Sequence, residues 1–147
     1  AKGVIETVKK LNWSPDIIHV HGWLASFLPL YLRNYYGNEP LFENSKIVTS
    51  AYNQGFDGTL DEKETDKMSF DGIAEDKVAV LKSPDYTNVM KVALENSDAA
   101  IVNSEEIPQA LKEYLETIEI PVLPYQNTET IQDAYLDFYQ NKVLASE

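Results

Sequence analysis

The sequence predicts an α/β fold, a Rossmann-like doubly wound parallel sheet, and two observations support this fold class. Four short apolar runs of strand length alternate with segments whose apolar residues recur at helical spacing. This alternation implies right-handed crossovers and a parallel sheet with helices on both faces. The chain has 147 residues, 44% of them hydrophobic, so we expect one domain over residues 1–147.

The first half of the chain supplies two of the four strands. The predicted elements are a helix over residues 4–12, a strand over 16–20, a helix over 23–35 and a strand over 46–51. Ser14-Pro15 ends the first helix, because a proline disfavours helical backbone at the residue before it. The second helix is apolar on nearly all sides, which indicates that it is covered, and we expect Pro29 to bend it.

Residues 52–83 predict a long, mobile loop. The segment contains Gly55, Gly58 and Gly72, an acidic run over residues 61–66, and little apolar periodicity. Loops of this length in compact domains are usually functional or disordered. A short helix near residues 72–80 is the alternative.

The second half of the chain supplies the other two strands. The predicted elements are a helix over residues 86–96, a strand over 99–102, a helix over 104–115, a strand over 121–124 and a helix over 128–144. Ser104 is a residue type that caps helix N-termini, and the helix that follows it has the clearest amphipathic pattern in the chain. The strand over 121–124 lies between two prolines, which is typical of an edge strand.

Charge and composition exclude several classes of partner. The 24 acidic and 12 basic residues give a net charge of −12, which repels a phosphate backbone, so we expect no nucleic acid. No apolar run approaches the ~20 residues that span a bilayer, and no signal peptide opens the chain. We therefore expect no membrane partner and a cytoplasmic location. Without cysteine, the chain forms neither disulfides nor thiolate metal sites.

The candidate site lies directly after the predicted strands, because parallel α/β sheets bind ligands at the carboxyl ends of their strands. His21 and Trp23 follow the first strand, and Asn53 and Gly58 belong to the segment after the second. A tryptophan offers an apolar platform to a sugar ring, while an amide and a glycine suit a loop that wraps a polar ligand. The structural alternatives are a histidine bonded to loop backbone, a core tryptophan and an ordinary turn.

The two histidines of the chain, His19 and His21, lie two residues apart where the first strand ends. This spacing places both on one face of a strand, but two imidazoles alone leave a metal under-ligated, so we expect no metal. The sequence also lacks the glycine-rich dinucleotide turn, the nucleoside-triphosphate P-loop and the G-x-S-x-G nucleophile elbow. We therefore expect no cofactor, and we assign no catalytic residue.

Several stretches carry a recognisable pattern: PDIIHVHGW at residues 15–23, preceded by VIET at 4–7, then PLY at 29–31, SKIV at 45–48, Asn53 with FDG at 56–58, and SDAAIVNSE at 97–105. These stretches resemble the N-terminal domain of the bacterial glycogen synthases and plant starch synthases. The first contains the family's proline-aspartate and histidine-x-histidine pattern, followed by tryptophan. The matches keep the family's order across about residues 4–115.

The resemblance implies a GT-B architecture, in which two Rossmann-like domains face a cleft and this chain is most of the N-terminal one. It also implies retaining transfer of glucose from ADP-glucose to the non-reducing end of an α-1,4-glucan. The implied partners are therefore an α-glucan acceptor and ADP-glucose. In that family the N-terminal domain mainly holds the acceptor, which gives His21, Trp23, Asn53 and Gly58 a substrate-binding role.

The chain also departs from the family pattern. Gly22 stands where the family usually has aspartate, and Leu24 and Tyr52 stand where it usually has histidine. The donor-phosphate loop and the C-terminal nucleotide-binding domain are absent from the sequence, so we expect this isolated chain to be inactive. The alternatives are a non-catalytic glucan-binding or regulatory module and an unrelated doubly wound domain for a nucleotide or phospho-sugar. A helical pattern begins directly at Ala1, which favours a chain cut from a longer protein. The clean end of the last predicted helix instead favours a naturally short relative of the family.

Overall fold

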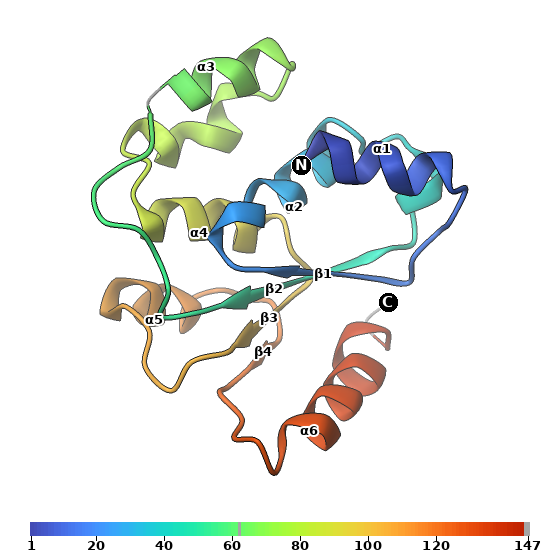
Figure 1. Ribbon diagram of the computed structural model, residues 1–147, viewed down its shortest axis with the longest axis vertical. Coiled ribbons are helices and arrows are strands. Elements are labelled where there is room, and N and C mark those ends of the chain that lie inside the picture. The colour runs from blue at the N-terminus through green and yellow to red at the C-terminus, as the bar shows by residue number, and fades with distance from the viewer. Residues whose placement is uncertain (62, 146–147) are drawn as a thin grey trace.

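The computed structural model describes residues 1–61 and 63–145, and a four-stranded sheet lies at its centre (Figure 1). The strands are β1 (Ile17–His21), β2 (Lys46–Ala51), β3 (Ala99–Val102) and β4 (Val122–Leu123). They pair in chain order and all in parallel, with His21 opposite Ser50 and Ala51 opposite Val102. The Rossmann-like parallel α/β fold predicted from the sequence is confirmed.

Helices cover both faces of this sheet. The helices in the described part of the chain are α1 (Lys2–Lys10), η1 (Trp23–Ala25), α2 (Phe27–Asn34), η2 (Pro40–Phe42), α3 (Lys63–Phe70), η3 (Glu75–Lys82), α4 (Tyr86–Glu95), α5 (Gln109–Leu115), α6 (Ile131–Phe138) and η4 (Tyr139–Val143). Because the strands follow one another in a single direction, right-handed crossovers place α2, α4 and α5 on one face. The helix α6 lies on the opposite face (Figure 1).

Alternation along the strands divides the core into two sides. In β2, Ile47 points toward α2 and α4, whereas its neighbour Val48 packs with Phe138 and Val143 of the α6–η4 segment. The same alternation sends Ser50 to the α6 side. In β1 the alternation places His19 on the α6 side, while Val20 packs in the core under α2 and α4. His19 and Ser50 therefore lie on the side that α6 covers, whereas Thr49 faces the other side, where its hydroxyl bonds to Ser97.

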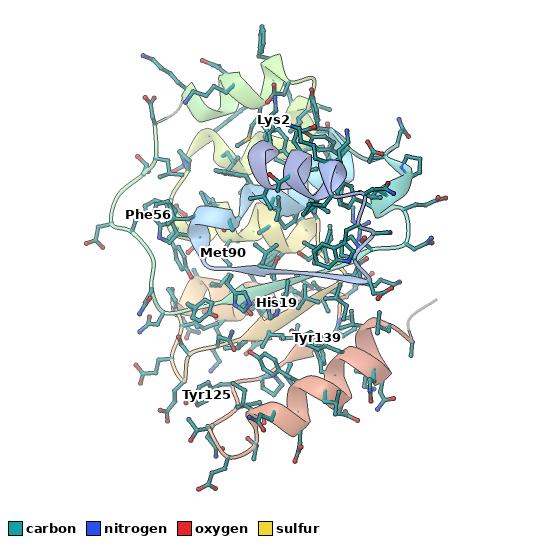
Figure 2. The ribbon with its side chains drawn as sticks, turned by 45° about the vertical axis from the view of Figure 1, so that its right-hand side comes forward. Lys2, His19, Phe56, Met90, Tyr125 and Tyr139 are labelled. Atoms are coloured by element: carbon teal, nitrogen blue, oxygen red, sulfur yellow. The ribbon has the colours of Figure 1, made fainter. Side chains whose placement is uncertain are left out.

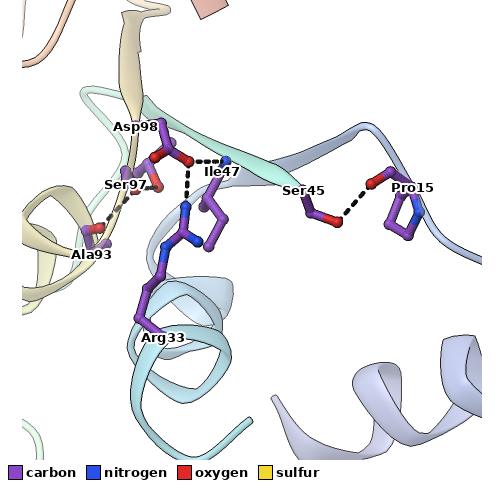
Figure 3. Close-up of polar contacts among 8 residues, drawn as sticks. Pro15, Arg33, Ser45, Ile47, Ala93, Ser97 and Asp98 are labelled. Atoms are coloured by element: carbon purple, nitrogen blue, oxygen red, sulfur yellow. Dashed lines mark hydrogen bonds and ion pairs between the residues drawn. The ribbon is translucent and has the colours of Figure 1, made fainter. Parts of the chain in front are cut away.

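Polar contacts fix the beginning of β2 (Figure 3). The Ser45 hydroxyl donates to the Pro15 carbonyl oxygen at 2.6 Å, which ties β2 to the segment before β1. The Asp98 carboxylate accepts from the Ile47 backbone N–H at 2.6 Å and also pairs with the Arg33 guanidinium. One carboxylate thus joins β2, the start of β3 and the end of α2.

The segment over residues 52–83 contains two helices, α3 and η3, where the sequence analysis expected a long loop. The short helix considered near residues 72–80 corresponds to η3, and α3 was missed. In α3, Met68 is buried whereas Phe70 is 92% exposed, so the apolar residues of this helix do not form one continuous face. That is why periodicity did not reveal this helix.

Two local predictions were wrong. The single helix expected over residues 23–35 is divided into η1 and α2, which places Pro29 in the first turn of α2, where its missing N–H is not needed. The helix expected from Ser104 begins only after Pro108, because a proline disfavours helical backbone at the residue before it. Ser104 does not cap α5, and its hydroxyl instead accepts from the Asn53 backbone N–H at 2.9 Å.

Candidate functional site

The turn after β1 brings a histidine and a tryptophan together at the carboxyl end of the sheet. His21 is the last residue of β1, and Trp23 is the first residue of η1. Between them, Gly22 has φ 71° and ψ 167°, a backbone conformation that is essentially limited to glycine. This backbone conformation explains why a glycine stands here, and the flanking side chains of His21 and Trp23 both line one hollow.

The segment after β2 forms the facing wall and is held by three contacts. The Tyr86 hydroxyl donates to the backbone carbonyl oxygen of Tyr52 at 2.5 Å. Gly55 lies against the Tyr86 ring so closely that an added Cβ would come within 2.7 Å of it. The Asn53 N–H bond to Ser104 fastens the same segment to the end of β3. This wall is therefore well fixed.

Between these two segments lies a hollow of about 290 Å³. Its lining residues are His21, Gly22, Trp23, Leu24, Tyr52 and Gln54. The Trp23 ring packs on the Phe56 ring with centroids 4.7 Å apart, and Leu24 is 81% exposed. None of the lining residues described is a lysine, arginine, aspartate or glutamate. The hollow thus combines an apolar surface with neutral hydrogen-bonding groups.

The structure brings together two of the four residues singled out from the sequence. His21 and Trp23 line the hollow, but Asn53 and Gly58 do not. Asn53 supports the wall through its backbone, and Gly58 adopts a positive φ of 78° in an exposed turn. Tyr52 and Gln54 also line the hollow, and neither was singled out from the sequence as a binding residue. The signal that could have found Tyr52 was its place directly after β2.

A hydrogen-bonded cluster connects the two histidines beneath the hollow. His21 Nδ1 lies 2.8 Å from the Tyr52 hydroxyl oxygen, and His19 Nε2 lies 2.6 Å from the Ser50 hydroxyl oxygen. The Asn103 amide nitrogen donates to both hydroxyls, at 3.0 Å to Ser50 and 2.9 Å to Tyr52. The two imidazole rings are 3.9 Å apart between centroids. The ends of β1, β2 and β3 therefore share one polar cluster.

Two tyrosines of the α6–η4 segment complete this cluster from below, and Figure 2 shows His19 and Tyr139 on the sheet and the helix respectively. The Tyr139 hydroxyl oxygen lies 2.6 Å from His19 Nδ1, and the Tyr135 hydroxyl donates to Asn103 Oδ1. Both nitrogens of His19 are therefore engaged by hydroxyl groups and neither is free for a metal. Among the residues that the structure describes, no group of three or more histidine, aspartate or glutamate side chains is placed to hold a metal ion.

The surroundings of the cluster favour neutral histidines. Burial, and to a lesser extent charge repulsion from the nearby His21, lowers the pKa of His19 from 6.5 to about 4. Burial also lowers the pKa of His21. A neutral imidazole has one N–H donor and one acceptor nitrogen, so each ring must take a defined orientation in the hydrogen-bond pattern.

A larger hollow, of about 700 Å³, lies between α5 and the carboxyl ends of β3 and β4. Its floor includes Val102 and Val122, and its rim has Glu105, Glu106 and Glu116 with only Lys112 to offset them among the described lining residues. This acidic rim opposes a phosphate-bearing ligand. It also contains none of the residues singled out from the sequence, so we favour the smaller hollow as the candidate site.

Comparison with known proteins matches this chain to one family. The family model for the starch synthase catalytic domain matches residues 1–119. The chain belongs to the starch synthase catalytic domain family. It is 33% identical to the glycogen synthase of Chlorobium luteolum over 103 residues, which are 70% of this chain and 20% of that protein. It is 31% identical to the glycogen synthase of Chlorobium phaeobacteroides over 118 residues, 80% of this chain and 22% of that protein.

The chain spans about a fifth of the length of these glycogen synthases. The family match covers α1 through α5 and ends before β4 and α6, so the hollow lies inside it and Tyr135 and Tyr139 lie outside. No solved structure matches the chain significantly. None of the helices described has the length and apolar character needed to cross a bilayer.

Proposed function

We propose that this starch synthase family chain is part of a glucosyltransferase and holds the α-glucan acceptor in the hollow between His21 and Tyr52. In the complete reaction, glucose would pass from ADP-glucose to the non-reducing end of an α-1,4-glucan. We also propose that the 147-residue chain does not catalyse this transfer alone. The observation that carries the proposal is the convergence of His21 and Trp23 on one hollow within the family match.

The chemistry of the hollow supports a sugar ligand. Trp23 and the exposed Leu24 offer apolar surface to the C–H face of a glucose ring. His21, Tyr52 and Gln54 provide neutral groups for hydrogen bonds to hydroxyls. Neutral polar groups beside a partly apolar wall are a common composition for a carbohydrate site.

The same lining disfavours the nucleotide sugar. A diphosphate needs positive charge or a row of backbone N–H groups, and no lysine or arginine is present among the described lining residues. The net charge of −12 adds a repulsive field. These features support an acceptor role rather than a donor role for this chain.

The neutral lining also supports a second candidate, a non-catalytic glucan-binding module. Both candidates bind glucan at the same hollow, and they differ in whether a protein that contains this chain transfers glucose. Glucan elongation by the full-length product of the gene separates them. Elongation by the full-length product supports the enzyme, and glucan binding without elongation supports the module.

The proposal is tested by titrating maltotetraose and ADP-glucose against the ¹⁵N-labelled chain and following amide shifts by NMR. We expect millimolar maltotetraose binding with shifts around Trp23, and no tight ADP-glucose binding. Each charge-assisted hydrogen bond lost with the family's aspartate and histidines removes about 1.5–3 kcal/mol, which weakens the site to this range. Trp23→Ala should abolish the maltotetraose shifts.

Trp13→Ala is the matched control, because Trp13 is 59% exposed and lines a different, apolar hollow near α1. It should leave the titration unchanged. Identical shifts in wild type and Trp23→Ala would place the glucan site elsewhere. Micromolar ADP-glucose binding, or glucan elongation by the purified chain, would contradict the acceptor-only role.

A further inference from the structure

The Asn103 side chain sets a direction for the whole hydrogen-bonded cluster. Its amide group has two hydrogens, and these are donated to the Ser50 and Tyr52 hydroxyl oxygens. Its carbonyl oxygen accepts from the Tyr135 hydroxyl. With the NH₂ side of the amide facing the two hydroxyls, each of them receives one hydrogen and must send its own hydrogen elsewhere.

The Tyr52 hydroxyl has a single hydrogen, and its remaining close partner in the cluster is His21 Nδ1 at 2.8 Å. Tyr52 therefore accepts from Asn103 and donates to His21. A nitrogen that accepts this hydrogen bond carries no proton of its own. The neutral His21 ring must then carry its proton on Nε2, the nitrogen left to meet a ligand in the hollow.

The same reasoning applied to His19 gives the opposite tautomer. The Ser50 hydroxyl accepts from Asn103 and donates to His19 Nε2 at 2.6 Å. The proton of the neutral His19 ring then lies on Nδ1, where it is donated to the Tyr139 hydroxyl oxygen at 2.6 Å. One amide orientation thus determines the tautomer of both rings.

We propose that Tyr52 is a positioning residue, oriented by Asn103 and Tyr135, which fixes His21 as an Nε2–H donor toward the hollow. The ligand group that meets His21 is then an acceptor oxygen, such as a hydroxyl oxygen of a glucan. This specificity rests on the proposed function, whereas the tautomer follows from the cluster alone. The relay also links the family-matched part of the chain to α6, which lies outside that match.

The tautomers are measured without any ligand, in long-range ¹H–¹⁵N spectra of the histidine-labelled chain near neutral pH. The chain has two histidines, and loss of one set of signals in His21→Gln assigns them. We expect His21 protonated on Nε2 and His19 protonated on Nδ1. His21 protonated on Nδ1 in the wild type would overturn the relay.

Two substitutions test the direction of the relay. Tyr52→Phe removes the donor to Nδ1, so His21 should become a mixture of tautomers while His19 stays protonated on Nδ1. Asn103→Asp replaces the donating amide with an accepting carboxylate, so Tyr52 should turn to it and Nδ1 of His21 should gain a proton. A purely structural role for Tyr52 and Asn103 predicts neither change. An unchanged His21 spectrum in both variants, with native amide spectra, would refute the proposal.

Maltotetraose affinity then tests the link to the ligand. Tyr52→Phe should weaken binding about three- to tenfold, in the range of one neutral hydrogen bond. Tyr125→Phe, a matched control on an exposed tyrosine outside the cluster, should not. Weaker binding with an unchanged tautomer would show that Tyr52 acts by packing or by its own hydrogen bond to the glucan, and would overturn the relay. Correct tautomers without any maltotetraose binding would support the relay and contradict the proposed function.

Discussion

At the scale of single residues, the burial of His19 links stability to pH. The pKa of His19 is lowered to about 4 in the folded chain and is near 6.5 in the unfolded chain. Between these two pH values the unfolded state binds a proton that the folded state does not bind, and this favours unfolding. The stabilisation is complete above about pH 6.5 and is lost as the pH falls toward about 4. A pKa difference of this size corresponds to about 3 kcal/mol in the free energy of unfolding. Because His19 is only partly buried, solvent reduces this value, and we expect a loss of about 2 kcal/mol.

Urea unfolding at several pH values measures this loss, and His19→Gln is the control. Glutamine has no titrating group, so the variant should lose less stability than wild type between about pH 6.5 and about 4.5. Carboxylates with a lowered pKa, such as those of Glu6 and Asp71, lose stabilisation in both proteins as the pH falls. If both proteins lose the same free energy of unfolding, the pKa of His19 is not lowered in the folded chain, and the ring becomes charged there as readily as in the unfolded chain.

Position in the chain was enough to bring two of the four residues singled out from the sequence to the hollow. His21 and Trp23 were found because they directly follow a strand, and the structure places both at one hollow. The cluster beneath could not be predicted, since Tyr139 contacts His19 across 120 positions of sequence and Tyr135 contacts Asn103 across 32. Such contacts depend on where α6 packs, which no local pattern encodes.

At the scale of secondary-structure elements, regular patterns predicted four strands and most helices. The helix α3 escaped because Met68 is buried while Phe70 is exposed, so its apolar residues do not follow one face. The late start of α5 follows from Pro108, a signal that was present in the sequence but outweighed by the capping preference of Ser104. Strand signals were more reliable because every strand residue of β2 from Ile47 to Ala51 is buried.

Asp98 joins three elements, and its removal should destabilise the fold more than a surface ion pair would. Asp98→Ala leaves the Ile47 N–H without its acceptor and the Arg33 guanidinium without its partner. A half-buried N–H left unpaired costs about 1–3 kcal/mol, whereas an exposed ion pair contributes at most about 1 kcal/mol. We expect a loss of about 2 kcal/mol in the free energy of unfolding, measured with urea.

Two matched variants separate these contributions. Asp98→Asn keeps an oxygen for the Ile47 N–H and removes only the charge, and Arg33→Ala removes only the ion pair. Each should cost less than about 1 kcal/mol. If Arg33→Ala costs as much as Asp98→Ala, the ion pair rather than the backbone hydrogen bond holds β2 in place.

At the scale of the whole molecule, the strand order explains where the candidate site lies. All described strands run in parallel and in chain order, so their carboxyl ends share one edge, and the hollow lies where β1 and β2 end. Helices from the crossovers cover one face, while the α6–η4 segment covers the other with Phe138, Val143 and two tyrosines. The histidines lie on this second face, which is why tyrosines of the α6–η4 segment, outside the family match, contact the cluster beneath the hollow.

The net charge of −12 makes whole-molecule stability depend on salt. Ion pairs such as Lys9–Glu39 and Arg33–Asp98 offset only part of the acidic excess, so repulsion among carboxylates opposes the compact state. Raising NaCl from about 20 mM to about 500 mM shortens the screening length from about 20 Å to about 4 Å. At about pH 7.5 this should raise the Tm by about 4 °C, equivalent to about 1 kcal/mol, in a calorimetric or circular-dichroism melt.

The control for this salt prediction is the same salt series near the sequence pI of 4.5, where the net charge is close to zero and salt weakens only favourable ion pairs. The Tm should then stay constant or fall. A Tm that falls with salt at about pH 7.5 as well would show that attractive pairs outweigh the repulsion of the acidic excess.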